Sequence, residues 1–353
     1  MAIDRRTFTL GMGAAAGVAV LGQSRAAAQV TSRLPADVLS HVLPELRAAA
    51  AQMLQFSAPE TGKVDVATLV RGRAMMPVRP RLAAPAVESK AIPSLGGAPD
   101  VRIYIINARP DGARPVIVHL HGGGFILGSA AGDLASLQTE ARALDCIIVT
   151  VEYRLAPEAP FPAPLDDAYA ALLWTYRNCA ALGGDPRRIA VQGESAGGGL
   201  AAMLAIAARD RGEVPLIHQS LIYPMLDDRT GTKLPPFPIG RVAWTGALNQ
   251  AGWTAFLGRP AGQKAAPDGA VPARTRTVAG LPDTFIGVGA IDLFVEEDLD
   301  FARRLIEAGV PTDLQVVPGA YHGFDVAVPQ AASSQRFRQA QFAALTRAFA
   351  LAK

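Results

Sequence analysis

Short apolar runs of strand length alternate with helix-length segments along most of this chain, and this alternation constrains the fold more than any other feature. The strand-like runs lie at 101–106, 115–120, 147–151, 188–192, 216–223, 284–289 and 314–317. The helix-length segments lie at 37–53, 166–179, 196–209, 245–257, 296–308 and 333–351. Strands and helices that alternate in this way predict an α/β fold in which helices cover a mostly parallel sheet.

Two stretches depart from the alternation. Residues 29–95 are rich in Ala and Pro, and residues 227–275 are rich in Pro, Gly and Trp around one expected helix. In α/β folds, ligands bind beyond the carboxyl ends of the strands. We therefore expect the second stretch to be an excursion that covers this edge of the sheet.

The composition supports a large folded core. Of the 353 residues, half are hydrophobic and 18% are charged, which argues against wholesale disorder. The net charge of +3 is small and the basic residues are scattered, so nucleic acid binding has little support. Cys146 and Cys179 have no metal-ligand spacing and make no disulfide framework, and Cys146 is expected to pack as a small hydrophobic residue.

The N-terminus has the features of an export signal. Arg5 and Arg6 precede an apolar run from Leu10 to Gly22, and three alanines at 26–28 offer a cleavage site. The run of thirteen residues is shorter than the about 20 that a membrane-spanning helix needs, so we expect no stable span. Residues 1–28 therefore predict a twin-arginine-like signal peptide and an exported, periplasmic or secreted protein. The alternative is a frayed helix with chance arginines.

The most informative motif is Gly193-Glu194-Ser195-Ala196-Gly197. It fits the pattern Gly-x-Ser-x-Gly, follows an expected strand and opens an expected helix, which is the setting of a nucleophile elbow. A turn this tight leaves no room for side chains at the two glycines, and the helix N-terminus favours developing negative charge. The alternative, a dinucleotide-binding turn, requires Gly-x-Gly-x-x-Gly after the first strand. We therefore expect Ser195 to be a nucleophile.

A glycine-rich turn upstream supplies the expected oxyanion hole. His121-Gly122-Gly123-Gly124 follows the apolar run 115–120. A tetrahedral intermediate needs several N–H groups aimed at one oxygen, and glycines let the backbone turn them inward. The expected donors are the N–H groups of Gly123, Gly124 and Ala196. His121 is expected to brace the loop through hydrogen bonds rather than act as a base.

The base and the acid are expected downstream of the serine, in the order Ser, acid, His. Of five histidines, only His322 follows the last expected strands, in a loop where its side chain can reach the site. Asp292 stands just past the end of the strand 284–289, where the acid belongs. The alternative for Asp292 is the N-cap of the next helix, and it could partly serve as both.

Together these motifs resemble the hormone-sensitive-lipase-like branch of the α/β-hydrolases, also called bacterial esterase family IV. The matching segments are 121–125, 152–158, 161–163, 193–198, 292–296 and 321–324. The resemblance implies a mostly parallel sheet of about eight strands, with helices on both faces, in a domain of residues 96–353. It also implies a helical cap, formed by residues 29–95 and the insertion at about 227–275. No metal or organic cofactor is implied.

The resemblance also assigns residues. It implies Ser195, Asp292 and His322 as a catalytic triad. It places supporting residues at His121, Glu194 and Glu296. On this resemblance Arg154 and Glu158 are structural, in buried or half-buried ion pairs behind the nucleophile.

The expected function is hydrolysis of short- to medium-chain acyl esters through a Ser195 acyl-enzyme, with a small-molecule ester as the substrate. Another acyl bond (lactone, amide, carbamate or acetylated polysaccharide) and a non-catalytic binder on the same fold stay open, as does a homodimer. Trp244, Trp253 and Phe256 either line an acyl pocket or form the cap's own small core.

Overall fold

The computed structural model describes residues 35–351, apart from residues 56–57, 59, 61 and 77. The expected signal peptide, residues 1–28, lies outside the described residues. Among the described helices, none combines the length and the apolar character that crossing a bilayer requires.

An eight-stranded sheet forms the centre of the molecule, in the order β1-β2-β4-β3-β5-β6-β7-β8. The strands are β1 (Val87–Ile92), β2 (Val101–Ile106), β3 (Arg114–Leu120), β4 (Ile147–Glu152), β5 (Gly184–Glu194), β6 (His218–Ile222), β7 (Asp283–Gly289) and β8 (Thr312–Val317). Strands β3 to β8 run parallel, and β2 is antiparallel to both of its neighbours. The predicted α/β fold with a mostly parallel sheet is confirmed.

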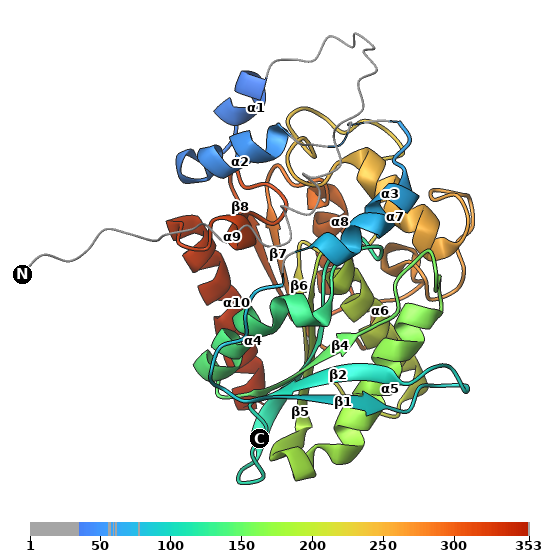
Figure 1. Cartoon of the computed structure of the whole chain (residues 1–353), viewed down its shortest axis with the longest axis vertical. Coiled ribbons are helices and arrows are strands. Elements are labelled where there is room, and N and C mark those ends of the chain that lie inside the picture. The colour runs from blue at the N-terminus through green and yellow to red at the C-terminus, as the bar shows by residue number, and fades with distance from the viewer. Residues whose placement is uncertain (1–34, 56–57, 59, 61, 77, 352–353) are drawn as a thin grey trace, which may run out of the picture.

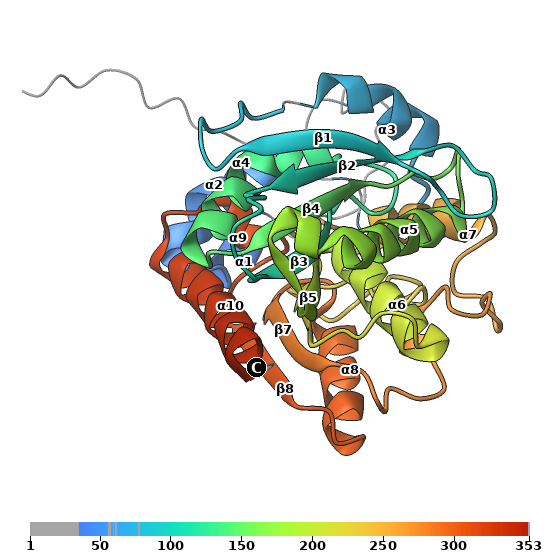
Figure 2. The same ribbon diagram turned by 90° about the horizontal axis from the view of Figure 1, so that it is seen from below.

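Helices cover both faces of this sheet (Figures 1 and 2). Helices α4 (Ala130–Ala143) and α10 (Ala332–Leu351) pack on one face, and α5 (Ala163–Asn178), α6 (Ala196–Arg211) and α8 (Val295–Glu307) on the other. Two buried clusters follow from the alternation of side chains along the strands. In β3, Val116 and Val118 contribute to the cluster beneath α5 and α6, whereas Ile117 contributes to the cluster beneath α4 and α10.

The predicted helix at 37–53 is wrong, because the chain breaks there into two. Helix α1 (Pro35–Ser40) ends before Pro44, a short 3-10 turn follows, and α2 (Arg47–Leu54) begins anew. Leu43, which precedes the proline, has the extended ψ of 135°. Proline disfavours a helical conformation in the residue before it and has no N–H to donate, so a continuous helix cannot pass this point.

The N-terminal segment and the insertion lie over the same end of the sheet. In Figure 1, α1, α2 and α3 (Val66–Gly72) lie at the top of the molecule together with α7 (Gly246–Leu257). Helix α3 contacts α7, and the guanidinium of Arg241 forms an ion pair of 2.9 Å with Glu60. Residues 87–92, in contrast, form β1, so the end of the N-terminal segment belongs to the sheet and not to the cap.

Candidate active site

Ser195 lies in the turn between β5 and α6. Its backbone has φ of 57° and ψ of −121°, a conformation that L-residues rarely adopt. The flanking glycines make this turn possible, since a Cβ at Gly193 would overlap the carbonyl of Gly197, and one at Gly197 would overlap the carbonyl of Leu120. The Ser195 N–H donates to Ile222 at 2.8 Å, and its carbonyl accepts from Met225 at 2.9 Å. These contacts tie the turn to the end of β6.

The structure brings Ser195, His322 and Asp292 into one hydrogen-bonded chain. His322 Nε2 lies 2.9 Å from Ser195 Oγ, and His322 Nδ1 lies 2.9 Å from Asp292 Oδ2. His322 comes from the loop after β8, and Asp292 from the loop after β7. The other oxygen of Asp292 accepts from the Phe294 N–H at 3.0 Å. Because the N-cap of α8 is Phe294, Asp292 is not the N-cap of that helix.

The expected oxyanion turn lies beside the nucleophile. A Cβ at Gly122 would stand 3.5 Å from the Cβ of Ser195. Gly123 and Gly124 have φ of 122° and 62°, and the Leu127 N–H donates to the Gly123 carbonyl at 2.8 Å. In the part of the chain that the structure describes, the N–H groups of Gly123, Gly124 and Ala196 donate no hydrogen bond to the protein. These three N–H groups therefore have no acceptor within the described protein.

His121 braces the oxyanion turn. Its ring stacks on Tyr153 with the centroids 4.2 Å apart, and its Nδ1 donates to the Gly122 carbonyl at 2.9 Å. The Tyr153 hydroxyl in turn donates to the His121 carbonyl at 2.6 Å. Burial lowers the pKa of His121 to about 4, so this imidazole is neutral at physiological pH.

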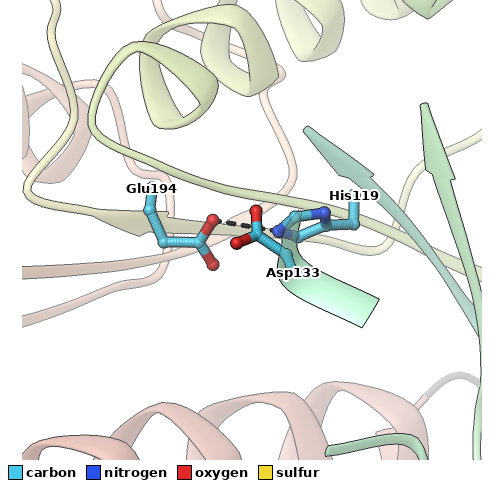
Figure 3. Close-up of side chains that lie close together, drawn as sticks. All are labelled: His119, Asp133 and Glu194. Carbon is cyan, nitrogen blue, oxygen red and sulfur yellow. Dashed lines mark hydrogen bonds and ion pairs between the residues drawn. The ribbon is translucent and has the colours of Figure 1, made fainter. Parts of the chain in front are cut away.

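Glu194 forms an ion pair with His119, a residue to which the sequence analysis assigned no role. His119 Nε2 lies 2.9 Å from Glu194 Oε2, and His119 Nδ1 lies 2.9 Å from Thr150 Oγ1. Figure 3 shows His119 from β3, Asp133 from α4 and Glu194 from the end of β5 converging on one point. The one signal for this contact was a histidine inside an apolar strand, since a buried polar side chain needs a partner.

The charges of His119, Asp133 and Glu194, which form this cluster, change the pKa of His119 and of Asp133. Burial disfavours the charged form of His119, but the charge and hydrogen bond of Glu194, together with the charges of Asp133 and Glu140, outweigh burial and raise the pKa of His119 to about 9. Desolvation and the charge of Glu194 raise the pKa of Asp133 to about 7. The ligand atoms of the three side chains lie within 4.8 Å of one another, a spacing that a metal ion could bridge. Both nitrogens of His119 are already engaged, so the contacts are those of an ion pair.

The supporting role predicted for Glu296 is carried out by the next residue, Glu297. Glu296 is exposed on α8, whereas Glu297 is buried. One carboxylate oxygen of Glu297 accepts from the N–H groups of Leu226 at 2.6 Å and Asp227 at 3.3 Å, and the other accepts from the Thr230 hydroxyl. Glu297 therefore holds the loop after β6 against α8. The sequence did not distinguish the two acids, because only the phase of the helix decides which one faces inward.

Arg154 and Glu158 both form ion pairs, but with partners that the sequence did not identify. Arg154 makes a two-pronged contact with the buried Asp167, at 2.7 Å from Nη2 and 2.8 Å from Nε. Glu158 accepts from Arg73 Nη1 at 2.9 Å and lies at the surface. The first pair fixes the loop after β4 to α5, and the second reaches the N-terminal segment.

The arrangement defines a class of protein. A serine in a strained strand–helix turn, followed in the chain by an acid and a histidine at the ends of parallel strands, is the plan of an α/β-hydrolase. The profile of the family described as "alpha/beta hydrolase fold" matches residues 117–326. The chain therefore belongs to the α/β-hydrolase family, and its resemblance to the hormone-sensitive-lipase-like branch is confirmed.

Two similar relatives are named as an esterase and a carboxylesterase. Esterase LipI of Mycobacterium tuberculosis is 36% identical over 253 residues, which span 70% of this chain and 77% of LipI. Carboxylesterase NlhH of the same species is 38% identical over 228 residues, which span 62% of this chain and 70% of NlhH.

Two solved structures of esterases are similar to this chain in both fold and sequence. Esterase LipW of Mycobacterium marinum has a TM-score of 0.72 and 36% identity, over 88% of this chain and 97% of LipW. A bacterial heroin esterase has a TM-score of 0.74 and 34% identity, over 88% of this chain and 99% of that enzyme.

Proposed function

We propose that this protein is a serine carboxylesterase that hydrolyses short- to medium-chain acyl esters through a Ser195 acyl-enzyme. The observation that carries this proposal is the pair of 2.9 Å contacts from His322 to Ser195 and Asp292. The relatives named esterase and carboxylesterase support the same reaction class. A small-molecule ester is the only partner that the proposal requires.

Acylation begins when Ser195 Oγ attacks the ester carbonyl carbon. His322 Nε2 accepts the hydroxyl proton, and Asp292 keeps the other ring N–H directed at its own oxygen and stabilises the imidazolium. The carbonyl oxygen becomes an oxyanion. As the carbonyl re-forms, the bond to the alcohol oxygen breaks and His322 returns its proton to the departing alcohol.

Deacylation repeats these steps with water. His322 removes a proton from the water as its oxygen attacks the acyl carbon. Collapse of the second tetrahedral intermediate breaks the bond to Ser195 Oγ, which recovers its proton from His322. The products are one carboxylic acid and one alcohol for each ester and water consumed.

The oxyanion is stabilised in both steps by the N–H groups of Gly123, Gly124 and Ala196. These donors stand in a turn held by glycines and need no rearrangement at the moment of reaction. Removal of one donor of this kind typically lowers turnover by ~10²–10³. Ala196 contributes a second effect, because it begins α6 and places the positive end of that helix beneath the oxyanion.

Substitution of the nucleophile tests the proposal. We expect Ser195→Ala to lower kcat for p-nitrophenyl butyrate by about 10⁶-fold, the order of loss that accompanies removal of a catalytic serine. A fluorophosphonate probe should label the unaltered protein and not the variant. Ser136→Ala, an exposed serine on α4, is the matched control and should keep full activity. Full turnover by Ser195→Ala would refute the assignment of the nucleophile.

A further inference from the structure

Three aromatic residues of the insertion, which the sequence left undivided, take different places in the structure. Trp253 and Phe256 are fully buried in the large core cluster, where the ring of Phe125 lies 5.1 Å from the first and stacks at 4.1 Å on the second. Trp244 instead approaches the expected base, with its ring centroid 6.3 Å from that of His322. The rings that lie closer to this imidazole come from other parts of the chain.

The nearest of these rings belongs to Tyr223, directly after β6. Its centroid lies 4.7 Å from that of His322 with the planes at 65°, and the ring of Phe294 lies 5.1 Å away at 88°. The two nitrogens of His322 bond to Ser195 and Asp292. The aromatic contacts therefore limit the rotation of the imidazole about the line through these two bonds.

Tyr223 also bonds to the segment that carries His322. Its hydroxyl donates to Asp325 Oδ1 at 2.9 Å, and both side chains are buried. Asp325 lies three residues after His322, in the short helix α9 (Phe324–Ala327). Burial raises the pKa of Asp325, whereas the hydrogen bond from Tyr223 favours the ionised carboxylate. The tyrosine therefore contacts the His322 segment twice, through its ring and through its hydroxyl.

The backbone of Tyr223 lies between two residues that bond to Ser195. The Ile222 carbonyl accepts from the Ser195 N–H at 2.8 Å, and the Met225 N–H donates to the Ser195 carbonyl at 2.9 Å. The Tyr223 N–H donates to the Gly287 carbonyl at 2.6 Å, and its φ of 36° is one that residues with a side chain rarely adopt. A conformation of this kind persists only where the surrounding structure enforces it.

We propose that Tyr223 is a positioning residue that sets the separation between the nucleophile and its base. Its neighbours in the chain bond to the Ser195 turn and its side chain bonds to the His322 segment, so one residue connects the two partners of the proton transfer. This inference rests on the proposed esterase function and adds a residue to its mechanism. The distance of 2.9 Å from Ser195 Oγ to His322 Nε2 suits proton transfer. A misplacement of about 1 Å can lower turnover by ~10².

Substitution of Tyr223 by Phe tests the hydroxyl, because it keeps the ring. We expect Tyr223→Phe to lower kcat for p-nitrophenyl butyrate by about tenfold or more, with KM changed by less than about twofold. Labelling by a fluorophosphonate probe should slow to a similar extent, since the probe reacts with the same activated hydroxyl. A solely structural role would lower the melting temperature and leave kcat below the unfolding transition unchanged.

Substitutions of Asp325 test the acceptor of this hydrogen bond. Asp325→Ala removes the acceptor and should lower kcat as Tyr223→Phe does. Asp325→Asn keeps Oδ1 as an acceptor and should retain kcat within about threefold of the unaltered enzyme. Because the two side chains act through one hydrogen bond, the double variant Tyr223→Phe, Asp325→Ala should lose no more than either single variant.

Tyr321→Phe is the matched control. The hydroxyl of Tyr321, the residue before His322, is buried and has no hydrogen-bond partner in the described part of the chain. Its removal is the same chemical change close to the same histidine, and it should leave kcat unchanged.

Three outcomes would overturn the inference. One is a folded Tyr223→Phe variant with the kcat of the unaltered enzyme. Another is an equal loss of kcat in Tyr321→Phe. The third is a double variant in which the two single losses multiply, which would show that Tyr223 and Asp325 act independently. Absence of both ester hydrolysis and probe labelling in the unaltered protein would instead contradict the proposed function, and with it the role that rests on it.

Discussion

Ser195 has a strained backbone conformation because hydrogen bonds and close packing on both sides of the turn fix its backbone. Its N–H and carbonyl bond to the end of β6 and the loop beyond it, while the flanking glycines bring neighbouring backbone into contact with the turn. Such strain costs on the order of 1–3 kcal/mol and persists only where the fold enforces it. The benefit is a hydroxyl that projects from the sheet towards His322.

The ion pair behind Ser195 gives a prediction about pH and stability. His119 has a folded-state pKa of about 9, raised above its ordinary value of 6.5. Its contribution to stability is therefore fully present below about 6.5 and is lost as pH rises through about 9. Glu194→Gln removes the charge that raises this pKa. We expect the melting temperature of the unaltered protein to exceed that of the variant by several degrees at pH 7.5, and this difference to shrink by pH 10.

Two choices make this measurement specific. Asp133, whose pKa is about 7, is already mostly ionised at pH 7.5, so most of the change between the two pH values reports on His119. Glu296→Gln, an exposed acid on α8, is the matched control. A difference between unaltered protein and Glu194→Gln that stays constant from pH 7.5 to pH 10 would contradict a charged His119.

At the scale of elements, one arginine connects the N-terminal segment to the loops around Ser195. Arg73 Nε donates to the Ile126 carbonyl at 2.6 Å, Nη2 to the Ala156 carbonyl, and Nη1 to Glu158 at 2.9 Å. Ile126 lies two residues after the last glycine of the oxyanion turn. The guanidinium therefore joins the segment after α3 to the turn that is to bind the oxyanion.

Arg73→Ala should loosen this connection. Two carbonyl groups would lose a charged donor, and a lost hydrogen bond to a charged group costs about 1.5–3 kcal/mol. We expect a melting temperature lower by several degrees, faster proteolysis of the N-terminal segment and a lower kcat on p-nitrophenyl butyrate. Arg71→Ala is the control, because Arg71 is exposed and its polar partners among the described residues, Thr68 and Asp65, are its near neighbours in the chain. Equal effects of the two substitutions would show that Arg73 has no special role.

At the scale of the whole molecule, we propose that residues 1–28 direct export by the twin-arginine route. Two arginines, a short apolar run and small residues at the end of the segment support this proposal. A reporter fused behind residues 1–28 should reach the periplasm of a bacterial host. The double substitution Arg5→Lys and Arg6→Lys keeps the charge and should leave the reporter in the cytoplasm. Cytoplasmic retention of both fusions would refute the signal.

Short stretches of sequence were sufficient to predict those features whose geometry depends on adjacent residues. The turn around Ser195 and the glycine turn at 122–124 are recognisable because each needs specific residue types at adjacent positions. The alternation of apolar strands and helices predicted the α/β class for a similar reason, since burial on both faces imposes a composition on each strand. Asp292 and His322 followed from chain order, once the fold class was known.

Contacts between distant segments were decided only by the tertiary structure. His119 contacts Glu194, which lies 75 positions away in the sequence. Arg73 donates to the carbonyl of Ile126, 53 positions away. Trp244 packs against Gly124, 120 positions away. The sequence around each of these residues does not predict which distant residue it contacts. Glu297 was confused with Glu296 because the phase of α8 depends on what the helix packs against. The sequence by itself therefore determined the fold class and the expected nucleophile, whereas packing decided which side chains surround it.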